Sequence, residues 1–223
     1  MKTFRLTFSI ANGITGCVNN NTFFGLFCEA YKRLYGVDLL EDMLESLYKN
    51  EHTLAFSNPL ESNSFKLADF VVSEVPHAKL DRVSLTDNEL YVIEEKYTES
   101  FDVICVTDLD EFEEVVHQFI GMHIGSRKNV GKGLIKSIEC TETELPALDK
   151  TSRLISNIVP CSNLPVYGNF DYLTRKGYTI KGASQPTIML MKAGSDFVNC
   201  KTHVVGCILR FEDSYLNGTG VVV

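Results

Sequence analysis

Long apolar runs and regularly spaced cysteines are both missing from this sequence. No apolar run approaches the ~20 residues that a membrane-spanning helix requires, so we expect no membrane partner. The first ten residues, MKTFRLTFSI, are too short and too regularly alternating for a secretory signal peptide. The seven cysteines are odd in number, scattered and mostly inside apolar stretches, which favours reduced thiols over a disulfide framework. These absences predict a soluble, cytoplasmic protein.

Common motifs of catalysis and of nucleotide binding are also absent. No Gly-x-Gly-x-x-Gly, Gly-x-Ser-x-Gly or His-Glu-x-x-His occurs. The P-loop pattern fails because Ser126 stands where a glycine is required and Gly133 where a hydroxyl residue is required. Cys200, His203 and Cys207 have roughly ligand-like spacing, but a fourth metal ligand is missing, so buried cysteines are the better interpretation. We expect no metal, no cofactor and no ordinary mononucleotide site.

Charge is distributed unevenly along the 223 residues, whose net charge is −8. Residues 1–120 hold 9 Lys and Arg against 21 Asp and Glu, whereas residues 121–210 hold 12 against 6. Such asymmetry indicates a basic surface that meets a polyanion and an acidic surface that meets another partner. Two merely solvated faces explain the same counts equally well. The length allows one large domain or two small ones.

Hydrophobic periodicity predicts strands along the whole chain. Residues 3–10 alternate between apolar and polar, as in a half-buried strand. Residues 11–20 hold two glycines and a run of asparagines, which is typical of a loop. The further strands are expected at 53–56, 80–85, 90–95, 101–106, 134–140, 153–159, 187–191 and 203–211. Residues 86–89 are expected to form the loop of a hairpin.

Three helices are expected in the first half of the chain. The first is capped by Asn21 or Thr22 and ends at Gly36. Asp38 and Asp108 are expected to cap the second and the third. The inward-facing residues of the second helix are expected to be Leu39, Leu40, Met43, Leu44 and Leu47; those of the third, Leu109, Phe112, Val115, Val116 and Phe119. Without the less regular region 58–98, residues 3–140 follow the order βαββαβ, the split arrangement of ferredoxin-like and RNA-recognition folds.

The most informative segment is glycine-rich and basic. Residues 121–133 (GMHIGSRKNVGKG) hold four glycines, one histidine and three cations, and no acidic residue. Glycine lets the backbone approach a ligand closely, and successive N–H groups in such a loop form concavities that bind anions. Arg and Lys add charge and forked donors. A polyphosphate chain is the expected ligand, and a flexible turn with solvated cations is the alternative.

A second basic stretch, residues 168–182 (GNFDYLTRKGYTIKG), interleaves Arg175, Lys176 and Lys181 with aromatic residues. Such a composition suits single-stranded RNA, whose bases stack on aromatic rings while its phosphates meet cations. For this segment alone, a surface hairpin with core aromatics is the better interpretation.

The order of elements and the glycine-rich segment together resemble the RAMP superfamily of CRISPR effector subunits. The likeness is to the subunit that caps the 5′ handle of the guide RNA, as in the fourth subunit of type III-A Csm complexes and its shorter type IV counterpart. Four passages carry this resemblance: residues 20–30 (NNTFFGLFCEA), 53–59 (TLAFSNP), 121–133, and 215–221 (YLNGTGV).

The resemblance implies a particular architecture and role. It implies an α+β chain with a ferredoxin-like (RRM-like) domain at 1–145, an inserted β-hairpin thumb at 58–98, and a smaller β-rich C-terminal region at 146–223. It implies a non-catalytic crRNA-binding subunit of an antiviral CRISPR-Cas complex, with backbone and large subunits packing on its acidic faces. The expected RNA-binding residues are Asn21, Thr22, His123, Gly125, Ser126, Arg127, Lys128, Asn129, Gly131, Lys132 and Gly133, with Arg175, Lys176 and Lys181 from the second basic stretch.

Two other hypotheses stay open. A metal-independent endoribonuclease that processes repeat RNA would use His123 together with Lys128 or Tyr167. A protein-interaction module with no RNA role would present the basic loop to an acidic partner protein.

Overall fold

The chain is an α+β protein with many strands and few helices. Its structure, a computed structural model, describes residues 1–80, 87–126, 131–162, 164, 167–176, 186–211 and 214–223. The helices are α1 (Asn20–Tyr35), α2 (Val37–Tyr48) and α3 (Phe112–His117). The strands are β1 (Lys2–Ile10), β2 (Ile14–Thr15), β3 (Leu54–Phe56), β4 (Val71–Leu80), β5 (Asp87–Tyr97), β6 (Ser100–Thr107), β7 (Ile135–Glu142), β8 (Thr151–Arg153), β9 (Gly168–Asn169), β10 (Tyr172–Arg175), β11 (Ile188–Met191), β12 (Asp196–Val198), β13 (Val204–Phe211) and β14 (Ser214–Val221).

Four strands form the central sheet in the order β3-β6-β1-β7, and each neighbouring pair is antiparallel. The alternation predicted for residues 3–10 is confirmed, because Phe4, Leu6, Phe8 and Ile10 are buried while the side chains between them are half-buried. The predicted strands at 53–56, 101–106 and 134–140 are also present, with ends shifted by one or two residues. Period-two burial is therefore a property of β1, whereas β3 and β6 are buried along nearly their whole length.

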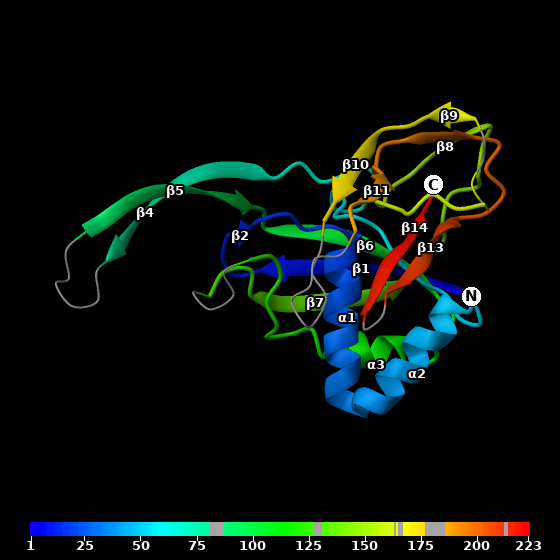
Figure 1. Cartoon of the computed structure of the whole chain (residues 1–223), viewed down its shortest axis with the longest axis horizontal. Coiled ribbons are helices and arrows are strands. Elements are labelled where there is room, and N and C mark those ends of the chain that lie inside the picture. The colour runs from blue at the N-terminus through cyan, green and yellow to red at the C-terminus, as the bar shows by residue number, and fades with distance from the viewer. Residues whose placement is uncertain (81–86, 127–130, 163, 165–166, 177–185, 212–213) are drawn as a thin grey trace.

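The three helices lie together against one face of this sheet (Figure 1). Aromatic side chains fill the space between the two layers. The rings of Phe8 and Phe101 stack at 5.2 Å between centroids, and those of Phe27 and Phe112 at 5.7 Å. Aromatic pairs at such distances add to the free energy gained by removing their apolar area from water. This core holds α1 in a fixed position on the sheet.

The predicted helix caps are wrong in detail. Asn19 caps α1, and Thr22 acts as the reciprocal third residue of a capping box, because α1 starts earlier than its apolar stripe. Gly36 ends α1 as predicted and directly precedes α2, so Asp38 lies inside α2 and Leu39 is 49% exposed. Asp108 accepts a hydrogen bond from the Thr53 N–H and does not cap α3, which begins only at Phe112.

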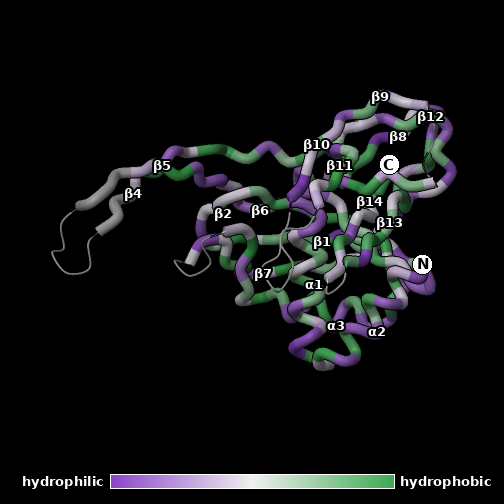
Figure 2. Tube along the Cα trace, in the orientation of Figure 1, coloured by the Kyte–Doolittle hydropathy of each residue, from purple (hydrophilic) through white to green (hydrophobic). Residues whose placement is uncertain are grey.

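A long β-hairpin, made by β4 and β5, projects away from the rest of the molecule (Figure 1). The predicted hairpin is therefore confirmed, but the predicted bounds of its strands and of its turn are wrong. Residues 87–89 belong to β5, and the predicted strand segment at 81–85 lies outside the described residues. Hydrophobic and hydrophilic residues alternate along the hairpin (Figure 2). β2, inside the segment predicted as a loop, pairs with the base of β5.

The C-terminal region, residues 146–223, holds strands joined by turns and irregular segments, and no helix, within the part of it that the structure describes. Strands overlap the predicted segments 187–191 and 203–211, whereas of 153–159 only Arg153 belongs to a strand, β8. Ile155 and Val221 from this region pack with Ile104 and Val106 on the face of β6 opposite the helices. The central sheet is thus covered on both faces along β6.

Buried polar groups join the C-terminal region to the first half. The Asn20 side chain, fully buried, donates to the Asn157 carbonyl at 2.8 Å and accepts from the Asn157 N–H at 3.3 Å. Ser156 Oγ donates to the Phe56 carbonyl at 2.9 Å. Each of these groups would be costly to leave without a partner, so they fix how the two parts meet. The boundary between two domains, predicted between residues 145 and 146, stays a prediction.

Candidate nucleic-acid interface

Helix α1 presents a polar first turn and a glycine to a hollow on the surface. Three adjoining cavities have Asn21 in their lining, and we call them together the α1 groove. The loop cavity, about 540 Å³, also contains Thr22, Gly25 and His123. The strand cavity, about 380 Å³, contains Cys17, Thr22 and Arg175. The helix cavity, about 710 Å³, lies between α1, α2 and the β13–β14 hairpin.

The groove brings together four residues that the sequence predicted to bind RNA. Asn21 and Thr22 come from the start of α1, His123 from the glycine-rich segment, and Arg175 from the end of β10. These three segments are far apart in the chain. Asn21 has a buried side-chain Nδ2 that makes no hydrogen bond. A buried donor without a partner is unusual in a folded protein, and a ligand in the groove would satisfy it.

Arg175 is the notable cation of the groove. Its side chain is half-buried, and burial lowers the pKa of its guanidinium. Among the residues that the structure describes, no carboxylate lies within 4.0 Å of it, whereas Arg33 in the loop cavity is paired with Glu29 at 3.0 Å. A guanidinium that is partly desolvated and lacks a carboxylate is suited to a phosphate, which it binds through two parallel hydrogen bonds.

The neighbouring predicted residues contribute less. Lys176 is exposed and does not line the α1 groove. Lys181, Arg127, Lys128 and Asn129 lie outside the described residues. The role predicted for these residues stays a prediction.

The glycines of residues 121–133 serve the loop's own folding as well as any ligand. Gly125 and Gly133 have φ of +80° and +67°, and a Cβ at either would collide with the backbone of Thr15 or of Ile124. Only the absence of a side chain lets the segment turn back on itself here. Gly131, with φ of +78°, has open space around it. The RNA-binding role expected for Gly125, Gly131 and Gly133 stays a prediction.

Ser126 and Lys132 anchor the same segment to neighbouring elements. The Ser126 N–H donates to the Thr15 carbonyl at 2.9 Å, and Thr15 Oγ1 donates to the Ser126 carbonyl at 2.7 Å. Lys132 Nζ lies 2.7 Å from Glu95 Oε2, in a pair whose side chains are 24% and 1% exposed. These contacts attach the segment to β2 and to the base of the β4–β5 hairpin. The charge of Lys132 is largely matched by Glu95.

Glu95 also receives a hydrogen bond from the Tyr97 hydroxyl, and this bond raises the pKa of Tyr97. Lys132 and Tyr97 line a separate cavity of about 340 Å³, away from the α1 groove. Sequence reasoning missed this pair because Glu95 and Lys132 meet only through the packing of the hairpin on the loop.

Sequence reasoning also missed two residues of the groove, Gly25 and Asn217. Gly25 lies in the interior of α1, where glycine is unfavourable, and a Cβ there would meet nothing within 4 Å. A glycine inside a helical pattern is a signal that could have drawn attention to it. Asn217, on β14, gives no comparable signal.

The described residues offer little support for metal or nucleophilic chemistry. They hold no group of three or more His, Cys, Asp and Glu placed to bind a metal ion. Tyr167 does not line the cavity that contains His123, and Lys128 lies outside the described residues. The ribonuclease hypothesis stays a prediction.

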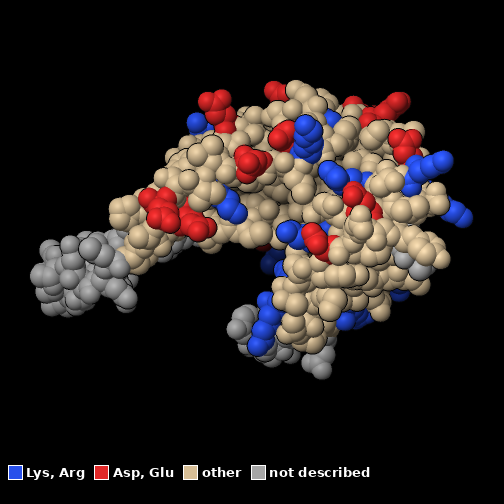
Figure 3. Space-filling view, turned by 90° about the horizontal axis from the view of Figure 1, so that it is seen from above, with Lys and Arg blue, Asp and Glu red and all other residues tan. Residues whose placement is uncertain are grey.

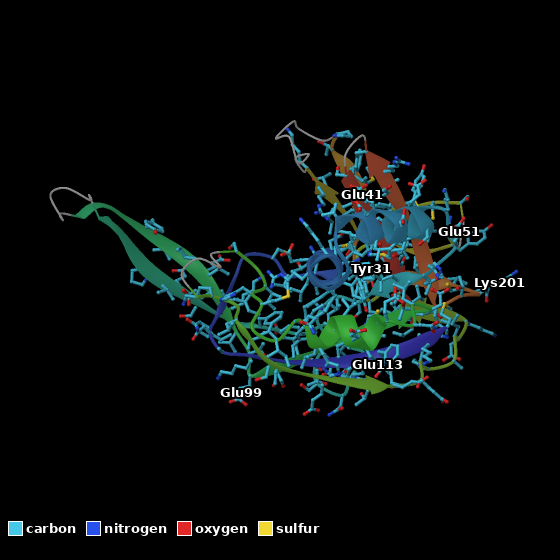
Figure 4. All side chains as sticks on the ribbon, turned by 90° about the horizontal axis from the view of Figure 1, so that it is seen from below. Tyr31, Glu41, Glu51, Glu99, Glu113 and Lys201 are labelled. Atoms are coloured by element: carbon cyan, nitrogen blue, oxygen red, sulfur yellow. The ribbon has the colours of Figure 1, made fainter. Side chains whose placement is uncertain are left out.

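Charged side chains of both signs are interspersed on the face seen in Figure 3. Acidic side chains of the first half lie at separate points of the surface, as Glu41, Glu51, Glu99 and Glu113 show in Figure 4. The charge asymmetry along the chain therefore does not produce one acidic patch at these positions. None of the helices in the described part of the chain is both long and apolar enough to cross a membrane.

No protein-family model matches the chain, and no curated protein resembles it in sequence. Solved structures with the same fold do exist. A chain of the Csm3–Csm4 subcomplex in the type III-A CRISPR-Cas interference complex has a TM-score of 0.64 at 13% identity, covering 100% of this chain and 98% of that chain. A chain of the Csm1–Csm4 cassette in complex with AMPPNP has a TM-score of 0.58 at 13% identity, covering 100% and 97%. A chain of the type III-B Cmr-beta complex, bound to cognate target RNA and AMPPnP, has a TM-score of 0.52 at 12% identity, covering 87% and 85%.

The fold is therefore that of subunits of type III CRISPR effector complexes. The first two of these structures both contain Csm4. The resemblance inferred from the sequence is confirmed for the fold.

Proposed function

We propose that this chain is a non-catalytic crRNA-binding subunit of a multi-subunit CRISPR effector complex, of type III or type IV. In this role it anchors the 5′ handle of the guide RNA in the α1 groove. The likeness to chains of the Csm3–Csm4 and Csm1–Csm4 assemblies supports a place in such a complex. The proposal that the chain binds RNA rests on the residues that line the α1 groove.

A single observation carries it: the half-buried Arg175 faces the polar start of α1 without a carboxylate within 4.0 Å among the described residues. The first turn of α1 contains no acidic residue, so no negative charge in it opposes a phosphate. Positive charge in a groove that also offers unpaired donors selects a phosphate backbone, independently of sequence.

The architecture is compatible with this role. The sheet order β3-β6-β1-β7, with helices between β1 and β3 and between β6 and β7, is that expected for a ferredoxin-like, RRM-like domain. The β4–β5 hairpin, inserted between β3 and β6, would be the thumb that lies over the guide. The acidic surfaces would then pack against basic surfaces of the backbone and large subunits.

The test measures RNA affinity of the purified chain carrying Arg175→Gln. With fluorescein-labelled single-stranded RNA at several salt concentrations, we expect weaker binding for every RNA sequence. The slope of log affinity against log salt should fall by about 0.7, the value for one phosphate contact with a single strand. Lys201→Gln is the matched control, because Lys201 is exposed and lies outside the α1 groove, at the opposite end of the molecule from the β4–β5 hairpin (Figure 4).

Equal affinity and equal salt slope for Arg175→Gln and the unsubstituted chain would refute the groove as the RNA site. Sequencing of RNA that co-purifies with the assembled complex tests the handle directly. Reads that begin with a common repeat-derived 5′ segment are expected, and loss of that RNA in the Arg175→Gln complex would link it to the groove.

A further inference from the structure

The helix cavity has a composition that a phosphate backbone alone does not require. Its volume of about 710 Å³ is within the range of small-molecule sites. Its walls include Phe24 from α1, Leu40 and Leu44 from α2, and Leu216 from β14. Such apolar walls suit a flat, partly apolar group more than a solvated phosphate.

A buried amide in this cavity lacks a partner. Asn217 is 1% exposed, and its Oδ1 accepts hydrogen bonds from the Thr219 N–H at 2.9 Å and from Thr219 Oγ1 at 2.6 Å. Because a backbone N–H can only donate, these bonds assign the oxygen and so identify Nδ2 as the other atom of the amide. Nδ2 is buried and makes no hydrogen bond. Asn21, which also lines this cavity, likewise has a buried Nδ2 that makes no hydrogen bond.

The charged residues that line this cavity are Lys32, Glu41, Arg175 and Arg210, so cations outnumber the carboxylate. Arg210 is paired with Glu45 at 2.8 Å, so its charge is matched. Arg175 lines both the helix cavity and the strand cavity. A phosphate on Arg175 would therefore stand at the border between the backbone path and the helix cavity.

We propose that the helix cavity binds one nucleobase of single-stranded RNA, turned out of the strand, whose phosphate is held by Arg175. A carbonyl oxygen or ring nitrogen of the base accepts the hydrogen bond that Asn217 Nδ2 otherwise lacks, and the ring lies between Phe24 and the leucines of α2. Unpaired bases in single strands are commonly bound in this way, by stacking and by edge hydrogen bonds. This inference rests on the proposed function, because it places an RNA nucleotide beside the same Arg175.

The test separates base binding from backbone binding by using two probes of equal length. One is fluorescein-labelled oligo(U), and the other is the same sugar–phosphate chain without bases. Asn217→Asp keeps the acceptor for Thr219 but removes the Nδ2 donor. We expect it to weaken binding of oligo(U) about tenfold, the effect of one lost buried hydrogen bond, and to change binding of the abasic chain much less.

Two further variants keep the test interpretable. Asn199→Asp is the control for the added charge, because Asn199 is exposed and lies outside the α1 groove; it should leave both affinities unchanged. Val37→Trp fills the helix cavity from a residue that is 48% exposed, so it should reproduce the base-selective loss even if Asn217→Asp folds poorly. Thermal unfolding of each variant identifies folding defects.

Equal effects of Asn217→Asp and Val37→Trp on the two probes, or no effect on either, would overturn the base site. Those results, together with an Arg175-dependent affinity, would leave the proposed function standing. If the unsubstituted chain bound neither probe, the proposed function and the base site would both fall. Uridine monophosphate provides a further outcome. If a stoichiometric amount of it lowered the affinity for oligo(U) to that for the abasic chain, the cavity would be a site for a free nucleotide, and the inference would also be overturned.

Discussion

Gly25 offers a test in which fold stability and RNA affinity should change in opposite directions. It lies in the interior of α1, and a Cβ there would have open space for 4 Å around it. Glycine in a helix interior costs about 0.5–1 kcal/mol relative to alanine, mainly through backbone entropy. Gly25→Ala should therefore stabilise the fold by about 0.5–1 kcal/mol. For a chain of this size, that gain corresponds to a rise in Tm of about 1–4 °C.

Gly25→Leu should retain most of this stability, because leucine is nearly as favourable in helices as alanine. Its side chain, however, would occupy space in the loop cavity and the helix cavity, both of which Gly25 lines. We expect RNA affinity to fall at least about tenfold, or about 1.4 kcal/mol, while Tm does not fall. A loss of binding in a protein that is no less stable is difficult to attribute to misfolding.

Circular dichroism during heating measures stability, and fluorescence anisotropy with oligo(U) measures affinity. Gln118→Leu is the control, because it adds a leucine at an exposed position outside the α1 groove. Unchanged RNA affinity for Gly25→Leu would refute the α1 groove as the RNA path. A lower Tm for Gly25→Ala would show that a methyl group at this position meets other atoms, in contradiction to the open space around Gly25 in the structure.

Two stability predictions concern buried polar contacts. Lys132→Met leaves the buried Glu95 carboxylate without this cation and should lower the free energy of unfolding, measured in urea, by up to about 3–5 kcal/mol. The double variant Glu95→Gln/Lys132→Met should recover much of that loss. A change within about 0.5 kcal/mol for Lys132→Met would contradict the ion pair. Asn20→Leu should lower the free energy of unfolding by about 1–3 kcal/mol for each backbone group of Asn157 that loses its partner. Asn12→Leu removes one exposed hydrogen bond and should lower it far less. Equal stabilities of these two variants would show that the buried contacts do not join the two parts of the chain.

Local patterns in the sequence were sufficient to locate the main elements of the first half. The alternation over residues 3–10 and the apolar stripe of α1 depend only on near neighbours in the chain, since each element must present one face to a core. Gly36 was likewise readable as a helix end. The caps at Asn21, Asp38 and Asp108 were predicted wrongly, because several polar residues near each start compete and packing decides among them.

What the sequence by itself determined was therefore β1, β3, β6 and β7 of the central sheet, the helices of the first half, and the position of a basic, glycine-rich segment between α3 and β7. Only the tertiary structure decided that Asn21 lines one cavity with Arg175 and another with His123, that Lys132 pairs with Glu95, and that Asn217 keeps an unpaired buried donor. The physical reason is that periodicity records burial, which is a property of one segment. Pairing and the chemistry of a groove depend on distances between segments, and these are set by how the strands, the hairpin and α1 pack together.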